Sequence, residues 1–277
     1  MVCFTSLFLI SKAKSKAFII SVLLFSSCSE YQKVLKSPNP ELKYSKSIEY
    51  YEDGEYLKAL PLFEELLPLY KGTEKGQKLY FYYAYTNYHI DDLYQAAYHF
   101  RSYASTYSLS EYAKEALFMS AYCNYLDAPG PSLDQTPTQL ALEELQIFVN
   151  TYPESELVDS ANTLVDILNK KLEIKEFQNA KQYYKIQKYQ SAIVALNNMI
   201  TKYPDTEFLE EIKLTVLKSY YYLATNSVES KKKQRFAEGI EAYYDFIDNF
   251  ADGKSIEEAK LVYAKLIKEQ EQFLTEK

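Results

Sequence analysis

The sequence predicts an all-α protein, built as a solenoid of about five helical hairpins. Only 6 glycines occur in 277 residues and 16% of the residues are aromatic, a composition that favours helices over sheets and turns. Short segments also recur at a spacing of 37 residues, which is typical of helical repeat arrays. Within each copy, bulky and small residues follow helical spacing. We therefore expect a repeat domain over residues 41–277.

A repeated small residue marks the first helix of each early hairpin. Residues 84–88 read AYTNY and residues 121–125 read AYCNY, 37 positions later. The same offset relates Ser47 to Ala84, so a more diverged copy precedes these two. We predict that Ser47, Ala84 and Ala121 lie at the centres of three first helices.

Each second helix carries a small residue, and an aromatic residue follows it eleven positions later. A small residue lets two helices approach closely, while bulky neighbours one turn away fill the flanking space. Pro153 and Pro204 directly follow two of the aromatics, and proline cannot continue a helix. The pattern resembles five tetratricopeptide-like hairpins. The small residues are Ala59, Ala96, Ala141, Ala192 and Gly239, and the aromatics are Tyr70, Tyr107, Tyr152, Tyr203 and Phe250.

The loops are marked by helix-breaking residues. Prolines and a glycine predict a loop from Asp127 to Pro137, and a polar stretch predicts another from Asn226 to Gln234. No break is visible between Leu157 and Gln187, which leaves open one long helix or two helices. We place the N-terminal repeats at about 41–152 and the C-terminal repeats at about 153–277.

The N-terminus has the features of a secretory signal. Three lysines precede a mostly apolar run over 17–25, which is followed by Ser26, Ser27 and Cys28. The run is shorter than the roughly 20 residues that a spanning helix needs. It resembles a bacterial lipoprotein signal, with Phe25 where leucine is commonest. We predict a signal peptide over 1–27, a lipid on Cys28 and a tether over 28–40; an ordinary secreted chain is the alternative. Residues 1–11 exceed what a signal needs, so the true start codon stays open.

The composition argues against several classes of function. The chain has 31 basic and 38 acidic residues, and loss of the signal would remove three lysines and no acid, which argues against nucleic acid as a partner. His89 and His99 are too far apart in sequence for a helical metal pair. Adjacent acidic pairs point to different helix faces. We therefore predict no enzyme activity, no cofactor and no metal site.

An aromatic stripe is the strongest candidate for a binding site. In a tetratricopeptide hairpin, the first helix lines the concave surface through residues three before, one after and four after the small residue. Aromatic side chains there would offer a large contact area at low entropic cost. We predict a peptide groove; the alternative is that a half-turn error places several of these rings in the core. The residues are Tyr44, Ile48, Tyr51, Phe81, Tyr85, Tyr88, Phe118, Tyr122 and Tyr125.

A basic cluster precedes the last predicted hairpin. It consists of Lys231, Lys232, Lys233 and Arg235. It is either a solvated loop or a contact with an acidic partner surface or with lipid headgroups.

The chain resembles the BamD family of outer-membrane assembly lipoproteins. The resemblance is carried by residues 29–31 (SEY) after the cysteine, residues 59–63 (ALPLF), residues 112–116 (YAKEA) and the five hairpins. It implies a lipid-anchored protein at the periplasmic face of the outer membrane of a Gram-negative bacterium. The implied partners are BamA, the barrel-bearing core subunit, through the C-terminal repeats, and other subunits of the assembly complex. The C-terminal segments of unfolded outer-membrane proteins are implied to bind the N-terminal repeats. Such segments typically end in an aromatic residue.

Two other classes share some of these features. A periplasmic tetratricopeptide scaffold for peptidoglycan or cell-division enzymes would show the same repeats, and only the identity of its partners separates it. A glycan-binding lipoprotein of the SusD type also sets aromatics on a helical-repeat frame. This chain has no tryptophan and is short for the extra sugar-binding lobe.

Overall fold

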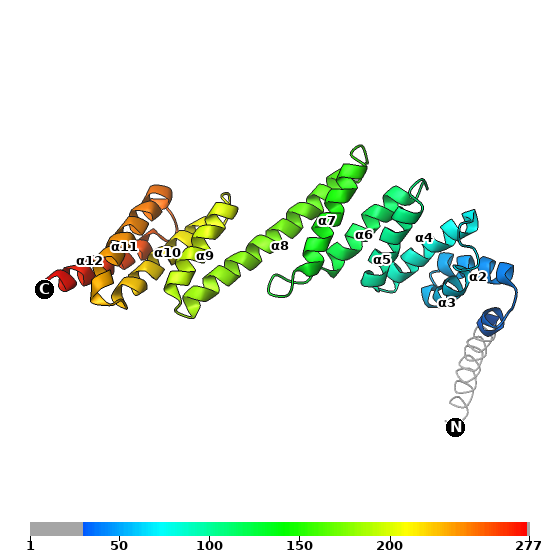
Figure 1. Ribbon diagram of the computed structural model, residues 1–277, viewed down its shortest axis with the longest axis horizontal. Helices are drawn as coiled ribbons and strands as arrows, with labels where there is room; N and C mark the ends of the chain where they lie inside the picture. The colour runs from blue at the N-terminus through cyan, green and yellow to red at the C-terminus, as the bar shows by residue number, and fades with distance from the viewer. Residues whose placement is uncertain (1–29, 276–277) are drawn as a thin grey trace, which may run out of the picture. The chain divides into compact units, whose positions relative to one another are not determined.

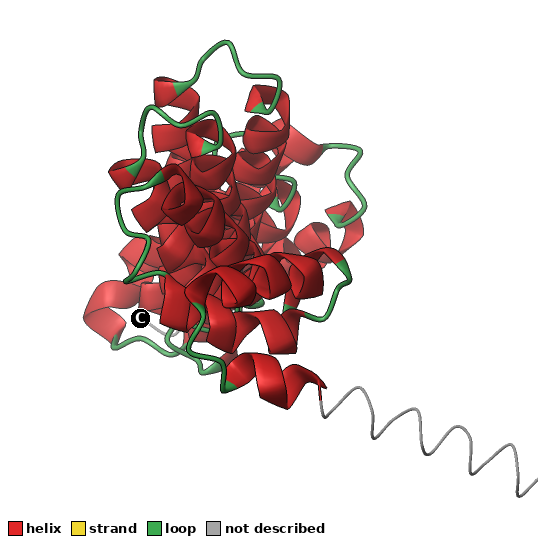
Figure 2. Ribbon diagram, turned by 90° about the vertical axis from the view of Figure 1, so that its right-hand side faces the viewer, coloured by secondary structure: helices red, strands yellow, loops and turns green. Residues whose placement is uncertain are grey.

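The computed structural model describes residues 30–275, which form helices joined by short loops without a strand among them (Figure 2). The predicted signal and Cys28 lie outside the described residues. Residues 30–35 were expected to belong to a tether, but they are helical. Val34 is buried, and the Tyr31 ring lies 5.7 Å from the Tyr50 ring. This part of the expected tether therefore packs on the first hairpin.

The described chain forms two compact units, and the first holds three helical hairpins. It comprises the chain up to Pro129 together with residues 136–165. Each helix packs against the next along the chain (Figure 1). The helices are α2 (Pro40–Glu52), α3 (Tyr56–Leu66), α4 (Glu74–His89), α5 (Leu93–Thr106), α6 (Ala113–Asp127) and α7 (Thr136–Thr151).

The second unit holds two further hairpins and a closing helix. It comprises residues 130–135 and the chain from Asp166 onward. Phe177 and Ala180 of α8 pack with Leu196 and Met199 of α9, and α12 packs on both α10 and α11. The helices are α8 (Val158–Lys185), α9 (Tyr189–Lys202), α10 (Leu209–Thr225), α11 (Glu229–Phe250) and α12 (Ile256–Thr275).

This architecture confirms the predicted all-α solenoid of tetratricopeptide-like hairpins. It also answers the question left open between Leu157 and Gln187, because α8 is one continuous helix of 28 residues. The division between the two units falls inside this helix, after Val165. None of the helices between residues 30 and 275 combines the length and apolar character needed to cross a membrane.

The predicted small residues lie where helices cross. Their side chains have no exposed surface at Ser47, Ala84 and Ala121 in first helices, and at Ala59, Ala96, Ala141 and Ala192 in second helices. At Gly239, an added Cβ would lie 2.6 Å from Cδ1 of the fully buried Leu266. The close helix crossings predicted at these positions are confirmed.

One predicted loop is confirmed and the other is mostly wrong. Residues 128–135 form the loop between α6 and α7, but only residues 226–228 separate α10 from α11. Lysine, arginine and glutamine are good helix formers, and no glycine or proline interrupts this stretch. The helix begins after Val228, which is extended and provides no side-chain cap. The basic cluster therefore lies on the first two turns of α11.

A buried carboxylate joins the second and third hairpins. Glu144 of α7 is 3% exposed, and it accepts hydrogen bonds from the Ser120 hydroxyl at 2.7 Å and the Asn124 amide at 2.9 Å. Arg101 of α5 supplies the counter-charge at 2.7 Å. The neighbouring Cys123 thiol is fully buried, and burial, with a smaller contribution from Glu144, raises its pKa to about 12. The thiol is therefore protonated at neutral pH.

Candidate peptide-binding groove

The nine predicted groove residues come from α2, α4 and α6, the first helices of three consecutive hairpins. Eight of them are half-buried in the structure. A half-buried ring packs one face or edge on its hairpin and leaves the rest for solvent or a ligand. These eight residues are Tyr44, Ile48, Tyr51, Tyr85, Tyr88, Phe118, Tyr122 and Tyr125.

Phe81 is the exception, and its assignment to the groove is wrong. Its side chain is 5% exposed. The ring stacks on Tyr112 at 4.6 Å and lies 5.4 Å from the ring of Tyr103 and 6.3 Å from that of Phe100. Tyr112 directly precedes α6, so a residue of the next hairpin covers Phe81. For this residue the alternative assignment to the core holds.

Three rings at the start of the first unit form a close cluster, which we call the N-terminal trio: Tyr51, Tyr56 and His89. The Tyr56 ring stacks on His89 at 4.2 Å, and the Tyr51 ring meets Tyr56 edge-on at 5.6 Å. Tyr51 also stacks on Tyr82 of α4 at 4.3 Å. The trio therefore joins the first hairpin to the second. It borders a cleft of about 480 Å³ lined by residues 54–58, His89 and Ile90.

His89 adds a neutral aromatic surface to this cluster. Burial lowers its pKa below the ordinary value of 6.5, so the ring is uncharged at neutral pH. His99 also has a lowered pKa because of burial, and its ring contacts Tyr83 at 4.6 Å. In the part of the chain that the structure describes, no three histidine, cysteine or acidic side chains gather as a metal site would require.

Two of the predicted groove residues, Tyr51 and Tyr85, carry hydroxyl groups whose pKa values are raised. The Tyr85 hydroxyl donates a hydrogen bond to the Glu115 carboxylate of α6. Burial, together with this hydrogen bond, raises the pKa of Tyr85, and burial raises the pKa of Tyr51. Both hydroxyls therefore stay protonated. The Tyr85 proton is already donated to Glu115, so its oxygen is left to accept a hydrogen bond, whereas the Tyr51 hydroxyl can donate to a peptide carbonyl.

The stripe continues onto the third hairpin as a ladder of rings along α6. Phe118 stacks on Tyr122 at 6.1 Å, and Tyr122 stacks on Tyr125 at 5.9 Å. Burial, with a smaller contribution from Tyr122, raises the pKa of the Tyr88 hydroxyl on α4. At the α2 end, the Lys75 ammonium lies 5.0 Å from the Tyr44 ring and pairs with Glu41 at 2.6 Å.

Sequence reasoning missed four members of this surface. Tyr56, Tyr82, His89 and Glu115 all contact predicted groove residues, but none occupies one of the three positions that were selected in each first helix. Tyr56 could have been found from the sequence, because a tyrosine stands three residues before the small residue of two second helices: Tyr56 before Ala59 and Tyr189 before Ala192.

Comparison with protein families matches residues 37–236 to the outer membrane lipoprotein family YfiO. The chain belongs to this family. It is also similar to the outer membrane protein assembly factor BamD of Caulobacter vibrioides, with 23% identity over 192 residues. That alignment covers 69% of this chain and 63% of the relative, so less than two thirds of the relative's length is matched.

Membership of the outer membrane lipoprotein family confirms the resemblance seen in the sequence. It places the protein at the outer membrane, facing the periplasm. Cys28 precedes both the matched and the described residues, so its modification stays a prediction.

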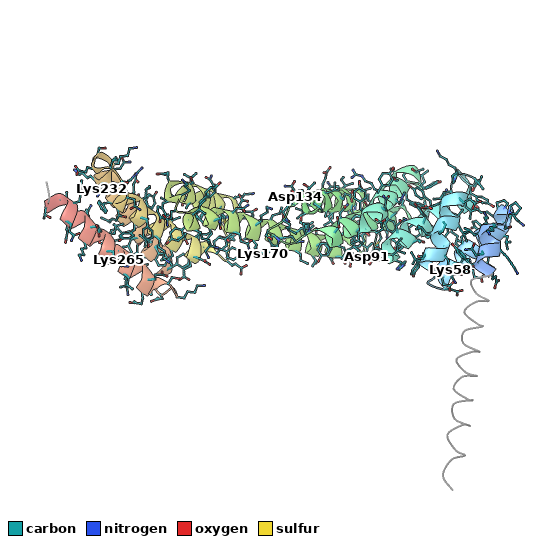
Figure 3. All side chains as sticks on the ribbon, turned by 90° about the horizontal axis from the view of Figure 1, so that it is seen from below. Lys58, Asp91, Asp134, Lys170, Lys232 and Lys265 are labelled. Carbon is teal, nitrogen blue, oxygen red and sulfur yellow. The ribbon has the colours of Figure 1, made fainter. Side chains whose placement is uncertain are left out.

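The basic cluster of this lipoprotein lies on one helix end in the second unit. Lys232, labelled in Figure 3, has its ammonium 5.9 Å from the Phe273 ring of α12. Arg235 donates a hydrogen bond to the Ser227 hydroxyl. Within residues 30–275, no ion pair joins any of the four cations to a carboxylate, whereas Lys213 and Lys218 on the preceding helix are both paired. The structure therefore does not neutralise this positive charge with acidic side chains of its own.

Proposed function

We propose that this outer-membrane lipoprotein is a non-enzymatic adaptor of the machinery that assembles β-barrel proteins. In this role it binds the BamA-like core barrel subunit and receives incoming outer-membrane protein segments. Family membership and the assembly-factor name of the Caulobacter relative support the general role. The two binding functions are our inference.

The half-buried aromatic surface of α2, α4 and α6 is the observation that carries the proposal. Segments that end in an aromatic residue would pack that ring on the solvent-facing parts of rings that already contact one another, at the separation of about 4.5–7 Å that aromatic pairs prefer. The protonated hydroxyl of Tyr51 offers a donor to a carbonyl of an extended peptide, and the Tyr85 oxygen offers an acceptor to a peptide N–H. Rings that already pack on one another lose little conformational entropy on binding.

The second unit is proposed to bind the core barrel subunit. Its basic cluster on α11, in which Lys231 and Lys233 are exposed and Lys232 and Arg235 are half-buried, suits an acidic protein surface or anionic lipid headgroups. Tagged protein, purified from detergent-solubilised native membranes, is expected to carry a barrel protein that has periplasmic repeats. Peptidoglycan or cell-division enzymes in its place would overturn the proposal in favour of the scaffold alternative.

The groove is tested with a labelled ten-residue peptide whose C-terminal phenylalanine is amidated. The double variant Tyr85→Ala and Tyr122→Ala is expected to raise the Kd at least tenfold, because each aromatic contact contributes about 1 kcal/mol. Fluorescence anisotropy measures the Kd. Tyr94→Ala is the matched control, since Tyr94 lies on α5 outside the stripe and is 74% exposed. An unchanged Kd in a correctly folded double variant would count against the groove.

A further inference from the structure

The second unit repeats the three-ring arrangement of the N-terminal trio at an offset of 133 residues, from Tyr51 to Tyr184. The corresponding rings are Tyr184, Tyr189 and Tyr222, which we call the second trio. Tyr184 meets Tyr189 edge-on at 5.9 Å and 61°, against 5.6 Å and 69° in the first unit. Tyr189 stacks on Tyr222 with ring centroids 5.1 Å apart and an interplanar angle of 18°, and Tyr56 stacks on His89 at 4.2 Å and 11°. The third pair of rings is tilted in both units: Tyr184 and Tyr222 lie 6.3 Å apart in the second, and Tyr51 and His89 lie 6.2 Å apart in the first.

The hairpin turn beside each trio corresponds at the same offset. Gly54 has a φ of 76° and Gln187 has a φ of 59°. A left-handed backbone is easy for glycine but strained for glutamine. The second unit nevertheless keeps this turn, which sets the start of α9 and with it the position of the Tyr189 ring.

Each trio borders a cleft built from the same structural parts. The first cleft, described above, lies between the α2–α3 turn and the end of α4. The second has a volume of about 350 Å³ and is lined by residues 187–191, Leu223 and Asn226, between the α8–α9 turn and the end of α10. Tyr222 is 39% exposed, so part of its ring is available to a ligand.

The two clefts differ in charge. In the first cleft, Lys58 pairs with Glu55 at 2.7 Å. In the second, Lys188 takes the place of Glu55 and is exposed, and within the described residues no ion pair joins it to a carboxylate. Glu258, which interacts electrostatically with Tyr184, is itself paired with Lys218 at 2.5 Å. The second cleft therefore combines aromatic rings with an uncompensated positive charge.

From this combination we infer that the second trio and Lys188 form a second peptide site, which binds a chain end whose last residue is aromatic. The ring packs on Tyr189 and Tyr222, and the terminal carboxylate pairs with Lys188. A C-terminal aromatic residue carries a ring and a carboxylate on the same Cα, which matches the adjacent rings and lysine of the cleft. This inference rests on the proposed function, because it takes the ligand to be the C-terminal end of an incoming outer-membrane protein.

The test is isothermal titration of the full-length, detergent-solubilised protein with a ten-residue peptide that ends in phenylalanine with a free carboxylate. Wild-type protein is expected to bind two peptides. Lys188→Glu and Tyr222→Ala are each expected to reduce this to one, with the affinity of the remaining site unchanged. The amidated form of the peptide is expected to lose the same site in the wild-type protein. Lys265→Glu makes the same charge change at an exposed residue of α12 and is expected to retain two sites.

The possible failures can be told apart. If the wild-type protein binds one peptide, and Tyr85→Ala weakens this binding but Lys188→Glu does not, the second site is overturned. The first groove then stays intact. Absence of binding by every peptide overturns the proposed function itself. Circular dichroism of each variant excludes unfolding as the cause of a lost site.

Discussion

At the scale of single residues, Glu144 shows how this helical array keeps a charge in its interior. The carboxylate accepts hydrogen bonds from Ser120 and Asn124 of α6 and pairs with Arg101 of α5. A buried charge is tolerated only when it is paired and hydrogen-bonded. Because its partners come from two other helices, this side chain fixes how α7 sits against α5 and α6.

Glu144→Ala is expected to lower the free energy of unfolding by about 3 kcal/mol, because it removes the acceptor of two buried hydrogen bonds and the carboxylate that pairs with Arg101. Urea unfolding followed by circular dichroism measures the change. Glu143→Ala is the matched control: its side chain is exposed and lies next in the chain, so a change within about 0.5 kcal/mol is expected. Equal effects of the two substitutions would contradict a stabilising role for the network.

The candidate groove marks the limit of prediction from single residues. Helical spacing selected eight residues that are half-buried, but it could not exclude Phe81. The burial of Phe81 depends on the Tyr112 ring, which stacks on Phe81 at 4.6 Å. Tyr112 lies between α5 and α6, in a later part of the chain. A contact of this kind is set by tertiary packing and leaves no trace in the local periodicity.

At the scale of elements, the hairpins were predictable because each one repeats a small residue at a helix crossing. The boundary between the two units was harder to predict. Residues 158–185 contain neither glycine nor proline, so nothing in the sequence marks where one unit ends inside this helix. The start of α11 was missed for a related reason. Val228 is not a capping residue, and the polar residues after it suit a helix as well as a loop.

Gly76, in the first turn of α4, lies against the backbone of the loop between α3 and α4. An added Cβ would lie 2.0 Å from the carbonyl oxygen of Tyr70, a backbone atom that cannot rotate away. Gly76→Ala is expected to destabilise the protein by about 2 kcal/mol through overpacking, although alanine is the better helix former. Thermal unfolding measures this. Gly130→Ala, which meets no atom within 4 Å, is expected to be neutral; a stable Gly76→Ala protein would show that α4 can shift.

At the scale of the whole molecule, two units begin with the same aromatic arrangement but present different charge. In the N-terminal trio the neighbouring lysine is neutralised by Glu55, whereas Lys188 beside the second trio is not paired with a carboxylate among the described residues. A repeat array can therefore reuse one hairpin geometry for two binding sites and separate them by a single charge. For an acidic chain in the outer membrane lipoprotein family, such local positive charge is where anionic ligands would gather.

The attachment of the whole molecule to the membrane is predicted to depend on Cys28. Cys28→Ser is expected to abolish labelling by radioactive palmitate and to move the protein from the detergent phase to the aqueous phase in a detergent phase separation. Cys123→Ser is the control, because that thiol is fully buried and burial raises its pKa to about 12, so it is neither accessible nor reactive as an acylation site. Label retained in the Cys28→Ser protein would show that acylation occurs elsewhere. Label absent from the wild-type protein would favour an ordinary secreted chain.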